Sequence, residues 1–219
     1  MIKLLKLNQL IFLKHTIFRK ELKKIKDEYM RSIKYIIILC IIAIGSFQSL
    51  YSQQAYSLNN EESRLQVKGT SSLHDWDMLA RKMEGTLQTE LNQKTIQDIT
   101  SASVYIEATS LKSGKSGLDS RAYKALKTDS YSAIIFRLKG LEKIGGDLYQ
   151  IRGDLTIAGT TRVIQFEVES SRMNEDKLRF NGKTSLKMTH FNIEPPSLMF
   201  GSVKAGDQVN ISFSVVFDK

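Results

Sequence analysis

The sequence predicts an all-β protein, a closed antiparallel barrel of about eight strands with one short helix near residues 118–127. Apolar and polar residues alternate with period two in many successive segments, which is typical of half-buried strands. Turn-forming residues separate these segments at hairpin spacing. The only prolines are the adjacent Pro195 and Pro196, so they interrupt none of the expected strands. A closed barrel leaves no exposed sheet edge, and a two-sheet sandwich is the alternative.

Residues 1–52 differ in composition from the rest of the chain and are interpreted as a leader. Residues 35–44 are apolar, follow Arg31 and Lys34, and precede small and polar residues, which is the layout of a secretory signal peptide. A bilayer span needs roughly 20 apolar residues, so a retained membrane anchor is the less favoured alternative. We therefore predict a signal peptide at 30–52 and a mature barrel domain at 53–219.

Residues 1–29 are superfluous to export if the signal peptide begins at Met30. We interpret them as a non-native N-terminal extension that results from a start codon assigned too early. The alternative is an authentic basic extension with a short amphipathic helix. Its apolar face would consist of Leu4, Leu5, Leu7, Leu10, Ile11 and Leu13.

The leader holds most of the excess positive charge. The whole chain has 32 Lys and Arg against 23 Asp and Glu, whereas residues 53–219 have 22 against 20. The high overall pI is therefore no sign of nucleic-acid binding by the mature domain. The only cysteine, Cys40, lies in the apolar run, so we expect no disulfide or thiol chemistry in that domain.

The alternation predicts strands along the whole mature domain. In the last of them, Val209, Ile211, Phe213, Val215 and Phe217 share one apolar face, while the residues between them are mostly polar. The expected strands are residues 64–68, 85–91, 103–108, 134–139, 149–157, 163–169, 177–188 and 208–217.

Turns and one helix complete the pattern. Residues 145–147 and 173–176 are predicted hairpin turns, and residues 112–117 form a Gly- and Ser-rich loop. Apolar residues recur at helical intervals in 118–127, behind a candidate N-cap at Ser116. No internal repeat or linker is visible, so the mature chain is expected to form a single domain.

The sequence contains few residues suited to catalysis or metal binding. His74 and His190 are the only histidines of the mature domain, and His74 begins the polar cluster at 74–77. A metal or acid–base site around them is the less favoured alternative, because the spacing matches no zinc motif. There is no nucleophile elbow and no phosphate-binding loop. We therefore predict no enzyme activity, no metal and no cofactor.

The apolar faces of the strands allow two interpretations. Their side chains can fill a solid core, or they can line a tunnel for an apolar ligand. Alternation alone is the same in both cases.

Several segments, in order, resemble the YceI-like family of exported bacterial proteins. Residues 63–76, ending in His74-Asp75-Trp76, resemble the family's opening strand and histidine-containing turn. Residues 151–163 are similar to its "Gly-x-Leu-Thr-Ile-x-Gly-Val-Thr-Lys" hairpin. The sequence departs from the family pattern at Ala133, where proline is common, and at Arg162, where lysine is usual. Segments 102–112, 118–136 and 188–196 extend the resemblance over roughly residues 55–218.

The resemblance implies a lipocalin-like barrel that holds a polyisoprenoid or another long-chain amphiphilic lipid, such as a fatty acid, without catalysis. A packed scaffold or stress-response protein that binds a partner at its surface is the alternative. The expected tunnel lining is Leu65, Val67, Trp76, Val104, Ile106, Phe136, Leu138, Leu155, Ile157, Ile164, Phe166, Phe213 and Val215. The expected contacts to a head group at the mouth are His74, Asp75 and His190.

Export and the resemblance together predict a periplasmic or secreted protein. The expected partner is an amphiphilic lipid or isoprenoid and not a nucleic acid. Peripheral contact with a membrane is compatible with such a ligand.

Overall fold

The computed structural model describes residues 19–20, 26, 29–30, 34, 52–92, 95–198 and 201–219. The chain divides into two units, Met1–Leu50 and Tyr51–Lys219. The predicted extension at 1–29 and signal peptide at 30–52 lie outside the described residues, apart from isolated positions and Ser52. Both remain predictions.

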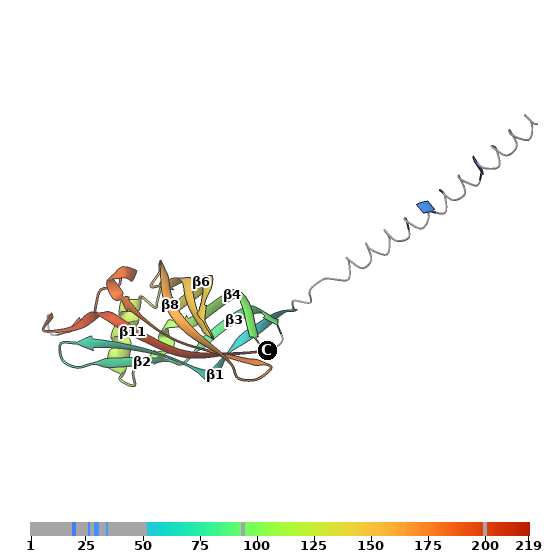
Figure 1. Ribbon diagram of the computed structural model, residues 1–219. Helices are drawn as coiled ribbons and strands as arrows, with labels where there is room; N and C mark the ends of the chain where they lie inside the picture. The colour runs from blue at the N-terminus through green and yellow to red at the C-terminus, as the bar shows by residue number, and fades with distance from the viewer. Residues whose placement is uncertain are drawn as a thin grey trace, which may run out of the picture. The chain divides into compact units, whose positions relative to one another are not determined.

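Within the described residues, eight antiparallel strands form one closed sheet, as predicted (Figure 1). Their order around the barrel is β11-β9-β8-β7-β6-β4-β3-β1, and β1 then pairs with β11 to close it. Closure leaves every long strand with two neighbours. The strands are β1 (Ser52–Ser71), β3 (Met83–Asn92), β4 (Thr95–Glu107), β6 (Ala133–Gly145), β7 (Leu148–Ile157), β8 (Thr160–Arg172), β9 (Lys177–Lys187) and β11 (Val203–Asp218).

The pairing of β1 with β11 closes the barrel. Leu65 pairs with Phe213, and Val67 pairs with Ile211, so apolar residues of both strands point to the inside at the same height. The register shifts between Asn59 and Arg64. There the Ser63 hydroxyl accepts a hydrogen bond from the Val216 backbone N–H at 2.9 Å. The Val216 N–H therefore has a hydrogen-bond partner despite the bulge.

Three short strands were not predicted: β2 (Trp76–Ala80), β5 (Leu111–Lys112) and β10 (Ser197–Leu198). β2 and β3 both pair with β1 and are separated only by residues 81–82. Asn60 supports this break, because its Oδ1 accepts a hydrogen bond from the Met83 N–H at 2.7 Å. β2 was not predicted because Asp75 and Asp77 flank its first residue, and such polar residues are typical of a loop.

The predicted helix is confirmed as α2 (Ser116–Leu126), but the predicted cap is wrong. Lys115 occupies the N-cap position, and no side chain caps the helix there. Instead, Asp119 accepts hydrogen bonds from the Ser113 backbone N–H at 2.8 Å and from its hydroxyl at 2.6 Å. The Tyr123 hydroxyl contacts the carbonyl oxygens of Thr109 and Leu111 at 2.7 and 2.8 Å. These bonds fix the helix to the chain segment before it.

The two ends of the barrel are closed differently. At the end of the β6–β7 and β8–β9 hairpins, side chains such as Tyr56, Leu178 and Phe217 are almost inaccessible to solvent and form one packed cluster. At the other end, α2 and the short helix η2 (Met188–Phe191) pack against the barrel through Leu126 and Phe191. Packed side chains therefore close one end of the barrel, and two helices cover the other.

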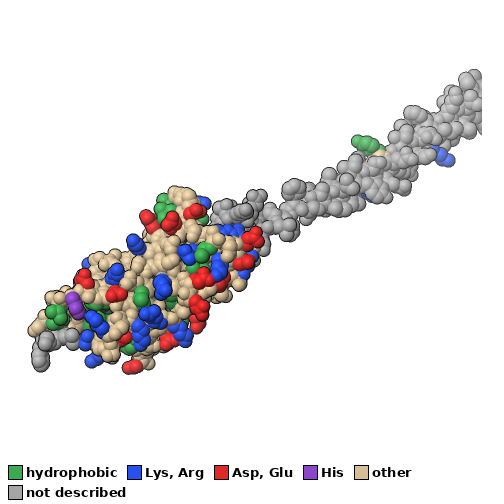
Figure 2. All heavy atoms as spheres, turned by 90° about the horizontal axis from the view of Figure 1, so that it is seen from below, with side chains coloured by type: hydrophobic (Ala, Val, Ile, Leu, Met, Phe, Trp, Pro, Cys, Tyr) green, Lys and Arg blue, Asp and Glu red, His purple; other side chains and the backbone are tan. Residues whose placement is uncertain are grey.

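The surface of the barrel is mixed in charge. Figure 2 shows basic and acidic side chains interspersed over the face in view, which agrees with the nearly balanced count for residues 53–219. Among the described residues, no helix has the length and apolar character needed to cross a bilayer.

Candidate functional site

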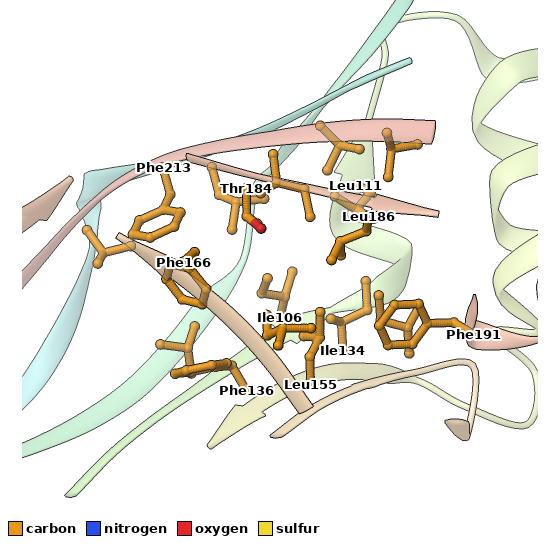
Figure 3. Close-up of a pocket in the computed structure, with 18 of the residues that line it drawn as sticks. Ile106, Leu111, Ile134, Phe136, Leu155, Phe166, Thr184, Leu186, Phe191 and Phe213 are labelled. Carbon is orange, nitrogen blue, oxygen red and sulfur yellow. The ribbon is translucent and has the colours of Figure 1, made fainter. Parts of the chain in front are cut away.

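The barrel encloses an apolar cavity of about 260 Å³ (Figure 3). Apart from Thr184 and Lys187, every residue that lines it is apolar. The hydroxyl oxygen of Thr184 points into the central space in Figure 3. Protein interiors are usually packed without voids of this size, so the interior is not a solid core. The walls can exclude water from an apolar guest, and they offer it very few polar contacts.

All thirteen side chains that we predicted for a tunnel line this cavity. They do so because side chains alternate across a strand, and the apolar set of every strand faces the inside. Phe136 and Leu138 on β6 and Phe213 and Val215 on β11 are examples. Contact of these residues with a ligand remains a prediction.

Besides further strand residues, two groups of lining residues outside the strands were missed. Ala122, Ala125 and Leu126 of α2 face the cavity, and Met188, Phe191 and Ile193 reach it from η2 and the loop that follows. The helical spacing of the α2 residues was visible in the sequence, but it did not show which element they would cover. The helix is thus part of the cavity wall.

Three phenylalanines form a row across the interior. The ring of Phe166 meets that of Phe136 at 5.7 Å between centroids and that of Phe213 at 5.8 Å, both edge to face. Such pairs add about 0.5 to 1.5 kcal/mol each beyond area burial. In Figure 3 the three rings lie together on one side of the cavity, whereas Phe191 lies on the opposite side. The row gives the cavity an ordered aromatic wall.

Glycines on the wall make room for these rings. A Cβ at Gly182 would lie 2.4 Å from Phe213, and one at Gly153 would lie 2.4 Å from Phe136. The rings therefore lie directly over the backbone of neighbouring strands, as in the aromatic covering of strand glycines. Trp76 lies over Gly69 in the same way, and its indole N–H donates to the Thr70 carbonyl at 3.0 Å.

None of the three predicted head-group contacts lines the cavity. His74 and Asp75 lie exposed in the turn between β1 and β2, whose backbone Ser71 holds through hydrogen bonds with His74. His190 lies exposed on η2 and lines an outer groove with Arg162 and Lys187. The structure therefore separates His74 from His190, and a head-group role for any of them remains a prediction.

The described residues contain no cluster of three or more His, Cys, Asp or Glu side chains that could hold a metal. The lowered carboxyl pKa values arise from local partners away from the cavity. The hydrogen bonds from Ser113 lower the pKa of Asp119, and those from the Thr189 backbone and hydroxyl lower the pKa of Asp207. Neither carboxylate lines the cavity, and no acidic residue is among the described residues that do.

A family model described as the YceI-like domain matches residues 56–217. The chain belongs to the YceI-like family. The match spans the whole barrel from β1 to β11, so the cavity described above is the interior of a YceI-like domain.

Solved structures show the same fold. BcnA from Burkholderia cenocepacia is 18% identical with a TM-score of 0.62, and the alignment covers 73% of this chain and 98% of that one. A polyisoprenoid-binding domain from Saccharophagus degradans, implicated in plant cell wall breakdown, is 15% identical with a TM-score of 0.59, covering 74% and 97%. The YCEI protein of Campylobacter jejuni is 18% identical with a TM-score of 0.51, covering 63% and 84%. No curated protein matches the chain.

Proposed function

We propose that this YceI-like protein binds a long-chain amphiphilic lipid, of the polyisoprenoid or fatty-acid kind, and carries or sequesters it without catalysis. The apolar cavity carries the proposal. A solid barrel would favour a scaffold role, whereas this barrel has an interior space lined almost entirely by apolar side chains.

The size of the cavity is sufficient for part of an apolar chain. Ligand pockets usually measure about 300 to 1,000 Å³, and a cavity of about 150 Å³ already holds a benzene molecule. The value of about 260 Å³ lies between these sizes. Each buried methylene contributes about 0.8 kcal/mol, so a chain can be held without an ionic contact inside. A longer chain requires the helical end to move outward or part of the chain to remain outside.

One comparison and one sequence prediction support the proposal. One structure with the same fold is described as a polyisoprenoid-binding domain. The predicted signal peptide at 30–52 would place this protein outside the cytoplasm, in the periplasm or in secreted form, where an insoluble lipid needs a carrier to cross water.

Native mass spectrometry with organic extraction tests the proposal. The protein is purified without detergent from the cells that produce it and is examined for a co-purifying apolar molecule. We expect a lipid in stoichiometric amount with the wild type. Phe136→Asp, which places a charge in the lining, should lose it, whereas the matched apolar variant Phe136→Leu should keep it. An empty, folded wild-type protein would favour the alternative of a scaffold that binds a partner at its surface.

A further inference from the structure

The hydrogen-bonded ladder between β8 and β9 ends before the end of the barrel near the helices. The ladder between these strands runs from Arg172 paired with Leu178 to Val168 paired with Gly182 and stops there. β8 nevertheless continues to pair with β7 down to Thr160, and β9 continues to pair with β11 up to Lys187. Residues 160–167 and 183–187 are thus held from one side only, and their facing edges are unpaired.

The β4–β6 ladder is also short, pairing residues 103–107 with 133–137. Beyond it, Ala102, Leu138 and Leu141 pack against the buried cluster at that end of the barrel. Apolar packing therefore covers this second gap. Ile164, Leu186 and Phe191 pack together at the gap between β8 and β9 as well, but that gap differs because a groove lies over it on the outside.

The outer groove and the interior cavity share part of their walls. The groove is lined by residues 162–165 of β8, residues 184–187 of β9, and His190, Phe191 and Gln208. Five of these residues, Ile164, Thr184, Leu186, Lys187 and Phe191, also line the cavity. These side chains, of which Leu186 and Phe191 are buried, therefore form the wall between the cavity and the groove at the place where the ladder is missing.

The groove is basic. Arg162 and Lys187 are exposed, no residue that lines the groove is acidic, and neither cation forms an ion pair within the described part of the chain. The Arg162 Nε–H donates to the His190 carbonyl at 2.9 Å, which fixes the guanidinium to η2. Asp207 is the carboxylate nearby, and it accepts two hydrogen bonds from Thr189, at 2.9 and 2.8 Å. The charge of Asp207 also acts on Lys187, but neither Arg162 nor Lys187 has a carboxylate within ion-pair distance among the described residues.

We propose that the opening between β8 and β9 is the entrance to the cavity, and that Arg162 and Lys187 hold an anionic head group, a carboxylate or a phosphate, of the bound lipid. This inference rests on the proposed function and adds the route and the head-group class. The apolar chain passes between Ile164 and Leu186 while the charged end stays in the groove. No ladder hydrogen bond has to break, because none joins the strands there.

Fluorescence binding of cis-parinaric acid and of its alcohol, parinaryl alcohol, to the full chain tests the head-group site. The two probes share one apolar chain and differ in charge. We expect the acid to bind more tightly, and the double variant R162E/K187E to weaken the acid by about tenfold while leaving the alcohol unchanged. The control K68E/R152E makes the same charge change at exposed positions outside the groove and should alter neither affinity.

The outcomes separate the two proposals. If neither probe binds the wild type, the proposed function is wrong, and the proposal of an entrance between β8 and β9 is wrong with it. If both probes bind equally well and R162E/K187E changes nothing, lipid binding stands and the basic groove is not the head-group site. If the acid binds more tightly and R162E/K187E weakens it, a probe with a phosphate head in place of the carboxylate ranks the two anions.

Binding kinetics test the route itself. Gln165→Trp places a large side chain at the exposed edge of the groove, and we expect it to slow association and dissociation together by about tenfold, with an unchanged Kd. Unchanged rates, or a change in only one of the two rates and therefore in Kd, would overturn the route. The matched variant Glu142→Trp lies on β6 near the other gap and should leave both rates unchanged. Slower rates in that variant would place the entrance there instead.

Discussion

The ring of Phe213 lies over Gly182 on the neighbouring strand, where a Cβ would come within 2.4 Å of the ring. A side chain at position 182 would displace the ring toward the cavity, which Phe213 itself lines. The absence of a side chain at position 182 therefore determines how much of the interior Phe213 occupies.

Gly182→Ala should lower the free energy of unfolding by about 1 to 3 kcal/mol, because the added methyl group overpacks a well-ordered site. It should also weaken ligand binding, since the displaced ring enters the cavity. Urea unfolding and a binding titration measure the two effects. Gly140→Ala is the control, because nothing lies within 4 Å of a Cβ there, and it should change stability by less than about 0.5 kcal/mol. Equal effects of both substitutions would contradict the contact.

The central ring of the phenylalanine row should matter most for packing. Phe166→Ala removes both edge-to-face contacts and enlarges the cavity, so we expect a loss of about 3 kcal/mol or more in the empty protein. Val163 lies on the same strand and is 55% exposed, so Val163→Ala should cost less than about 0.5 kcal/mol. Chemical denaturation measures the free energy of unfolding of both variants. A loss for Phe166→Ala as small as that for Val163→Ala would show that the Phe166 ring is not packed.

Trp76 is the only tryptophan of the chain and lines the cavity. An apolar ligand that displaces water from the cavity should therefore shift the tryptophan emission to shorter wavelength, and the shift should saturate with added ligand. The loading-deficient Phe136→Asp should show no shift, and Trp76→Phe should lose the signal. Binding detected by mass spectrometry without a spectral change would place the ligand away from Trp76.

The Asp119 carboxylate should make stability depend on pH in the acid range. Hydrogen bonds from the Ser113 hydroxyl and backbone lower its pKa in the folded state below the usual value of about 3.9. A lowered folded pKa means that the stabilisation is complete above about pH 3.9 and is lost as the pH falls through the folded value.

Asp119→Asn should therefore reduce the free energy of unfolding by about 1 to 2 kcal/mol at neutral pH, and the difference from the wild type should shrink in acid. Thermal unfolding between pH 7 and pH values below about 3 measures it. Asp129→Asn, at an exposed position, serves as the control. If the difference in free energy of unfolding between the wild type and Asp119→Asn does not change with pH, the two Ser113 bonds do not depend on the charge of Asp119.

Much of the fold could be predicted because strand periodicity is local. The face that holds Phe213 and Val215 follows from alternation alone, and the eight long strands each contain a predicted segment. β2 was missed because aspartates surround Trp76, and the cap of α2 was misplaced because Ser113 binds Asp119 instead of Ser116 capping the helix. Both depend on partners that the local pattern does not identify.

The sequence by itself determined which side chains face the inside of the barrel, because period two assigns each strand residue to one face. The resemblance in residues 63–76 and 151–163 identified the family. Only the tertiary structure decided that the inside is hollow, since packing density depends on how Phe136, Phe166 and Phe213 meet across strands. It also decided where the β8–β9 ladder stops, because pairing depends on the curvature of the closed sheet and not on the residues of one strand.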